Sequence, residues 1–122
     1  MSTIRCDNFG PSAGGTTYSA RGIAKAWVNF NGTGTIAARD SENVSSLTDN
    51  GTGNYTVNFS NAFGAGDYAF ACSCANGVGG NSIPSSLSTA TILTSSFQMI
   101  DARPTGAVDR DTFTSIFHGD LA

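Results

Sequence analysis

The sequence has few charged residues, a single histidine and no long apolar run. Charged side chains make up 12% of the 122 residues, and six basic against nine acidic residues give a net charge of −3. Nucleic acids and anionic membranes bind basic surfaces, so this balance has the wrong sign for either partner. Residues 1–7 lack the apolar core of a secretory leader, and no segment reaches membrane-spanning length. We therefore expect a soluble protein, made in a cytoplasm, that binds neither nucleic acid nor membrane.

Cysteine is scarce as well, and the three cysteines, Cys6, Cys72 and Cys74, form an odd count that argues against a disulfide framework. Thiolates bind zinc, but His118 is the single histidine and there is no second cysteine pair to complete four ligands. Free cysteine is often buried, so we expect Cys72 and Cys74 to be small apolar side chains on one face of a strand. The sequence predicts no metal site and no cofactor.

Signatures of catalysis are missing too. The chain has neither a Gly-X-Ser-X-Gly elbow nor a His-Glu-X-X-His helix. His118 could pair with Asp111 or Asp120 in a hydrolase such as a depolymerase, yet a lone histidine at a strand end is more often structural. The carboxylates of Asp40 and Glu42 could form an acid–base pair, but a solvated strand end or a salt link with the neighbouring arginine explains them better. We expect no enzyme activity and no catalytic residues.

Glycine is abundant, with 15 residues, and many of them interrupt short alternating runs of apolar and polar side chains. The tetrapeptide Asn-Gly-Thr-Gly occurs twice, at residues 31–34 and 50–53. Asn and Gly tolerate the positive φ of tight hairpin turns, so both copies predict turns of one β-meander. Neither copy carries the lysine of a phosphate-binding loop.

The length fits one domain, and the alternation predicts an all-β antiparallel β-sandwich or jelly-roll of about seven to eight strands. Residues 1–22 hold scattered polar residues and isolated apolar anchors, which predicts an extended N-terminal arm. Such an arm either hangs free or lies on another subunit. Residues 23–122 form the sandwich. The main strands are expected near residues 23–29, 43–48, 54–60, 67–74, 94–101 and 112–118, with a shorter run at 35–39 and a weaker one at 83–93.

The single tryptophan, Trp27, falls on the opposite side of its strand from Ala26 and Val28, together with Lys25 and Asn29. There it could stack on a sugar, lie in a subunit interface or sit under a covering loop. These alternatives stay open at the level of sequence.

Several segments resemble a module of bacteriophage tail-fibre and related virion proteins, especially from phages of aquatic bacteria and cyanobacteria. The resemblance is dense from Lys25 to Tyr68 and looser afterwards. It rests on residues 25–35 (KAWVNFNGTGT), 39–41 (RDS), 43–46 (NVSS), 48–59 (TDNGTGNYTVNF) and 65–68 (AGDY).

The resemblance implies a virion structural protein, assembled in the host cytoplasm, commonly a homotrimer, and engaged with a host surface glycan. Residues 1–22 would attach it to other virion proteins. The alternative is a capsid decoration or cement protein, or a neck or baseplate connector. We expect the contacts in two loops, residues 76–82 and 103–111, which are rich in glycine or charge and not needed for the core. Weak contacts would gain strength from three linked copies. The predicted ligand-binding residues are Asn76, Asn81, Arg103, Asp109 and Arg110.

Overall fold

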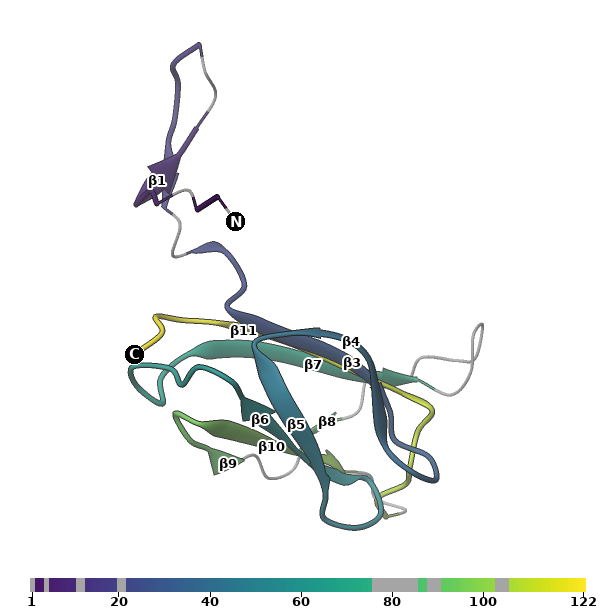
Figure 1. Cartoon of the computed structure of the whole chain (residues 1–122). Coiled ribbons are helices and arrows are strands. Elements are labelled where there is room, and N and C mark those ends of the chain that lie inside the picture. Colours follow the sequence, from purple (N-terminus) through teal and green to yellow (C-terminus); the bar gives the residue numbers. More distant parts are fainter. Residues whose placement is uncertain are drawn as a thin grey trace.

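A computed structural model describes residues 2–3, 5–10, 13–19, 22–75, 86–87, 91–102 and 106–122, which form strands and turns without an α-helix. Two antiparallel sheets face each other in the main body, and the predicted all-β sandwich is confirmed (Figure 1). Within these ranges the two sheets contain nine strands, of which two are only two residues long, against the seven to eight expected. The described residues contain no helix long and apolar enough to cross a membrane.

The first sheet has β10 next to β6, with β5 at one edge and the short β8 and β9 both pairing with β10. Its strands are β5 (Val44–Asp49), β6 (Asn54–Phe59), β8 (Ser86–Leu87), β9 (Thr91–Ile92) and β10 (Ser96–Ala102). The second sheet has the order β4-β3-β11-β7. Its strands are β3 (Ala26–Asn31), β4 (Ala37–Glu42), β7 (Ala69–Ala75) and β11 (Thr112–His118).

Period-two alternation puts one side of each central strand into the space between the sheets. In β3 the side chains of Ala26, Val28 and Phe30 are buried while the intervening residues are half-buried. Aromatic rings fill most of this core, and burial of each contributes about 1.5–3 kcal/mol. The buried rings belong to Phe30, Tyr55, Phe59, Phe63, Tyr68, Phe97, Phe113 and Phe117.

The cysteines follow the prediction in part. Cys74 is buried in the core, Cys72 is half-buried against it, and Cys6 in the arm is exposed. All three are free thiols. Burial raises the pKa of the Cys72 thiol, and a hydrogen bond with Ser115 opposes this shift. Cys72 and Cys74 thus behave as the small apolar side chains that were expected.

The chain changes from one sheet to the other at Asn43, between β4 and β5. Asn43 has a φ of +54°, a positive value that asparagine tolerates better than most residues. Its side-chain oxygen accepts the Asn61 N–H at 2.8 Å and its backbone oxygen accepts the Ser60 N–H at 3.1 Å. The prediction of a single meander was therefore wrong: the repeated tetrapeptides turn two hairpins that lie in opposite sheets.

The arm carries a short hairpin of its own, in which β1 (Asn8–Phe9) pairs with β2 (Tyr18–Ser19). Figure 1 shows this hairpin standing away from the sandwich, on the outer side of the sheet that contains β3 and β11. The chain joins that sheet where the Lys25 N–H donates to the Phe117 carbonyl oxygen at 2.8 Å.

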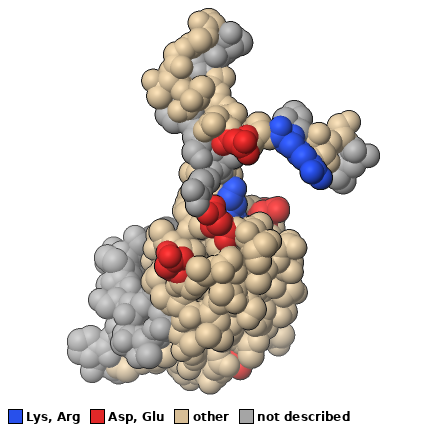
Figure 2. Space-filling model, turned by 90° about the vertical axis from the view of Figure 1, so that its left-hand side faces the viewer, with Lys and Arg blue, Asp and Glu red and all other residues tan. Residues whose placement is uncertain are grey.

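The sandwich has two different ends. The arm end comprises residues 22–25, 60–68, 93–95 and 118–122, and the turn end comprises residues 31–36, 50–53 and 106–111. Backbone hydrogen bonds hold each set together, for example from Phe63 to Thr94 and from Gly32 to Arg110. Strands of six or seven residues separate the two ends by on the order of 20 Å. Figure 2 looks onto the arm end and shows a mostly uncharged surface with a few acidic side chains near the base of the arm.

Candidate functional site at the turn end

The two copies of Asn-Gly-Thr-Gly lie side by side at the turn end and share one backbone feature. Their last glycines, Gly34 and Gly53, have φ values of +64° and +63°. Only glycine adopts this left-handed region without a steric penalty, which explains the residue type in both turns. The second glycines differ, since Gly51 has a φ of +116° while Gly32 is not among the residues with positive φ.

Gly32 is required for space. A Cβ at this position would lie 2.7 Å from the Phe113 ring, 2.8 Å from the Arg110 carbonyl oxygen and 2.8 Å from the Tyr55 hydroxyl. The Gly32 N–H donates to that same Arg110 oxygen at 2.8 Å. The first turn is thus packed directly against residues 106–111.

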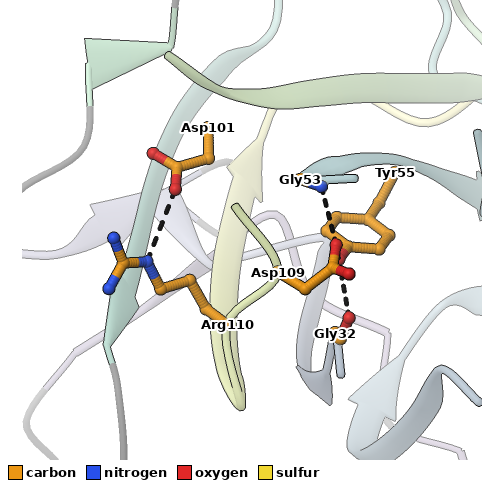
Figure 3. A network of polar contacts seen from close by, with 6 residues as sticks. All are labelled: Gly32, Gly53, Tyr55, Asp101, Asp109 and Arg110. Atoms are coloured by element: carbon orange, nitrogen blue, oxygen red, sulfur yellow. Dashed lines mark hydrogen bonds and ion pairs between the residues drawn. The ribbon is translucent and has the colours of Figure 1, made fainter. Parts of the chain in front are cut away.

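The second turn holds the same loop through Asp109 (Figure 3). The Asp109 Oδ1 accepts the Gly53 N–H at 2.7 Å and lies 2.6 Å from the Tyr55 hydroxyl. That hydroxyl also lies 2.7 Å from the Gly32 carbonyl oxygen, so its single proton has two acceptors. Tyr55 therefore connects both turns to the loop.

These contacts shift two pKa values in opposite directions. Hydrogen bonds from Tyr55 and from the Gly53 backbone hold the pKa of the Asp109 carboxyl below its ordinary range. Burial, reinforced by the neighbouring Asp109 carboxylate, raises the pKa of Tyr55. At neutral pH the site therefore contains an ionised Asp109 and a protonated Tyr55.

A buried ion pair anchors the far side of the loop. Arg110 Nε lies 3.4 Å from Asp101 Oδ2, and the two side chains are 5% and 0% exposed. Asp101 lies in β10, and its N–H donates to the Gly53 carbonyl oxygen at 2.8 Å. Figure 3 shows the two contacts, through Asp109 and through Arg110, reaching in different directions from adjacent residues.

The structure gives Asp109 and Arg110 a structural role that was not predicted. The Arg110 side chain is buried and faces Asp101, while Asp109 is exposed and accepts hydrogen bonds from Tyr55 and Gly53 through its Oδ1. Both residues hold the loop in place. Their part in ligand binding stays a prediction. The other predicted ligand-binding residues, Asn76, Asn81 and Arg103, lie outside the described residues.

The binding of the loop 106–111 by Tyr55 and the two glycine turns was not predicted from the sequence. One signal was available, because the tyrosine follows the second tetrapeptide at an inward-facing position of the best alternating strand, where its hydroxyl needs a partner. The partners, Gly32 and Asp109, are 23 and 54 residues away and have no local signature.

The two glycine turns expose hydroxyl and amide groups at the turn end, beside the exposed Asp109. Thr33 and Thr52, the third residues of the two tetrapeptides, are exposed, as is Asn50. The Thr33 hydroxyl donates to the Asn31 side-chain oxygen at 2.8 Å. Such groups can donate and accept hydrogen bonds with a hydroxylated ligand such as a glycan.

The arm end carries an open hollow of about 620 Å³, whose lining includes Asp67, His118 and Asp120. Of the two aspartates with which His118 could have paired, Asp120 lines the same hollow and Asp111 is not in its lining. No group of three or more His, Cys, Asp or Glu side chains in the described ranges could hold a metal ion.

The carboxylates of Asp40 and Glu42 are exposed on β4. Their exposure fits the first of the two structural alternatives, a solvated strand end. The Arg39 guanidinium, the partner in the second, donates to the Asp111 carbonyl oxygen and to the Asn29 side-chain oxygen. Arg39 thus ties β4 to the start of β11.

Comparisons with family models, with curated proteins and with solved structures find no match to this chain.

Proposed function

We propose that this chain is a virion structural protein of a bacteriophage, a short tail fibre or fibre-like component that displays its sandwich for recognition of a host surface glycan. One observation carries the proposal. The arm joins the sandwich at one end, and the two glycine turns with the loop 106–111 lie at the other. A chain held through its arm would therefore present the turn end outward.

The rigidity of the turn end supports this role. Tyr55, Asp109 and the ion pair of Asp101 with Arg110 fix the loop, so a ligand would meet a preformed surface. Preorganisation lowers the entropic cost of binding. The resemblance of residues 25–68 to tail-fibre modules supports a virion as the assembly, and linked copies would strengthen weak contacts.

The contact surface within the described ranges is assigned to Thr33, Thr52 and Asn50. The adsorption test uses the full chain as a competitor of virions for host cells. The Thr33→Ala, Thr52→Ala variant should compete less well than the natural chain. A Thr94→Ala, Ser95→Ala variant removes two exposed hydroxyls at the arm end and should compete normally. Equal competition by both variants would refute recognition through the turn end.

The alternative function is capsid decoration or a neck or baseplate connection, and the same arm would serve it. Antibody labelling of virions, viewed by electron microscopy, separates the two. Label at the distal tail is the expected result. Label over the head shell or at the neck would refute host recognition and support capsid decoration or a connecting role.

A further inference from the structure

The outer face of the sheet β4-β3-β11-β7 combines an apolar row with a polar row. Cross-strand register places Trp27 beside Ile116, and Ile116 beside Ala71. Ile116 is 45% exposed although β11 is one of the two central strands of this four-stranded sheet. Trp27, Ile116 and Ala71 thus form one contiguous apolar row, and an exposed contiguous apolar surface is one that another molecule can cover.

The neighbouring polar row is largely satisfied within the sheet. The hydroxyls of Ser73 and Thr114 lie 2.8 Å apart, and the Asn29 side-chain oxygen accepts a hydrogen bond from Arg39 at 3.2 Å. Polar groups that are already hydrogen-bonded to one another pay a smaller desolvation penalty when another molecule covers them. The outward residues of β7 are also small, since they are alanine and serine, so a partner can approach closely.

The arm has the complementary properties. Phe9 of the arm hairpin is 47% exposed, and Ile23 at the base of the arm is 49% exposed. Residues 1–22 contain two arginines and one aspartate, whereas residues 23–122 contain four basic and eight acidic residues. Two of those acids, Asp40 and Glu42, lie across from Asn29 and Trp27 at the border of the same face.

From these features we infer that the outer face around Trp27, Ile116 and Ala71 is the docking site for the arm hairpin of a second copy of this chain. Phe9 would cover Ile116, and the positive charge of Arg5 would lie near Asp40 and Glu42. Figure 1 shows the arm rising on the side of this face, so two copies that face each other could exchange arms reciprocally, each giving and receiving the same contacts. This inference rests on the proposed function and deepens it, because the neighbour that the arm would bind in the virion is another copy of this chain.

The single tryptophan makes the docking directly measurable by energy transfer to a dye on Cys6. Acceptor chains carry the dye on Cys6 and the substitutions Trp27→Phe and Cys72→Ala. Donor chains keep Trp27 and carry Cys6→Ser and Cys72→Ala. Cys74 is buried, so Cys6 is the thiol that reacts. Transfer in a mixture then requires the arm of one copy to lie near Trp27 of another, and we expect it to rise with concentration.

Matched variants of the donor chain locate the contact. Ile116→Ser should abolish transfer, while Leu93→Ser, at a residue 52% exposed at the arm end, should leave it unchanged. Circular dichroism shows whether each variant is folded. Arg5→Glu in the acceptor chain should lower transfer, because it reverses the charge that faces Asp40 and Glu42.

Three results would overturn the inference. One is the absence of transfer in the mixture. This includes the case in which a chain that carries both Trp27 and the dye shows transfer, because the arm would then dock on its own chain. Another is transfer that survives Ile116→Ser, which would put the arm on a different surface. The third is a Trp27 emission that responds to added bacterial oligosaccharide but not to other copies, which would assign the face to carbohydrate. Host recognition through the turn end is tested separately by adsorption, so either proposal can fail alone.

Discussion

Gly34 and Gly53 hold the same place in the repeated tetrapeptide and nearly the same φ, yet their surroundings differ. A Cβ at Gly34 would meet nothing within 4 Å, whereas one at Gly53 would lie 2.9 Å from the Val108 carbonyl oxygen. A side chain would therefore cost the same backbone strain at both positions. Only at Gly53 would it also collide with the loop 106–111.

This pair gives a matched stability prediction. Gly34→Ala should lower the free energy of unfolding by about 1–2 kcal/mol, the cost of a left-handed residue. Gly53→Ala should cost more, because the methyl group also displaces Val108 and weakens the hydrogen bond between Asp109 and the Gly53 N–H. Urea unfolding of both variants measures the difference. Equal losses would show that residues 106–111 are not seated on the second turn.

The ion pair of Asp101 and Arg110 should behave as a buried pair. Arg110→Met removes the guanidinium that pairs with Asp101 Oδ2 while the carboxylate stays buried, and should cost about 3–5 kcal/mol, a large part of the stability of a small domain. The double variant Asp101→Leu, Arg110→Met removes both charges and should recover most of that loss. Chemical denaturation of the three chains makes the comparison. A double variant as unstable as the single one would mean that the pair contributes through more than its charges.

Stability should fall in acid partly because of Asp109. Its pKa is lower in the folded chain than in the unfolded chain, where it is about 3.9. The stabilisation is therefore present above that value and disappears as pH falls through the lower folded pKa. Thermal unfolding between pH 6 and pH 2 should show a smaller loss for Asp109→Asn than for the natural chain. Parallel curves for the two proteins would contradict the assignment.

Stability should also fall at high pH, because of the buried tyrosines. Burial raises the pKa of Tyr68 to about 12, while an unfolded tyrosine ionises near 10. Stability is complete below about 10 and declines as pH rises toward 12, because only the unfolded chain ionises readily. Absorbance of tyrosinate during an alkaline titration tests this. Tyr68→Phe should lessen the decline, and an unchanged decline would assign the effect to other groups.

The three thiols should react at different rates with a thiol reagent. Cys6 is exposed and should react first, Cys72 slowly because its pKa is raised by burial, and Cys74 only on unfolding. The number of thiols titrated before and after addition of urea measures this. Rapid reaction of Cys74 in the folded chain would contradict its place in the core.

Much of the sandwich could be predicted because its information is local. Alternation is strict in residues 54–59, and the strands predicted at residues 54–60 and 112–118 correspond to β6 and β11 within one residue. The change of sheet at Asn43 could not be predicted. The neighbouring residues 41–44 contain a single asparagine and no other turn signal, and the change depends on which strands β4 and β5 pair with. The structural contacts of Asp109 and Arg110 could not be predicted for the same reason: a charged loop usually faces solvent, and only the tertiary structure brings Tyr55 and Asp101 against it.

The position of β11 has a consequence for how the protein is made. This strand lies between β3 and β7 in its sheet, yet it follows both of them in the sequence and is therefore synthesised after them. Until then β3 has one open edge and the rings of Phe30 and Tyr55 lack the cover of Phe113. This sheet can therefore be completed only after β11 is synthesised, through contacts of long sequence separation, which are slow to form. Neighbouring nascent copies would meet while their strand edges are still open.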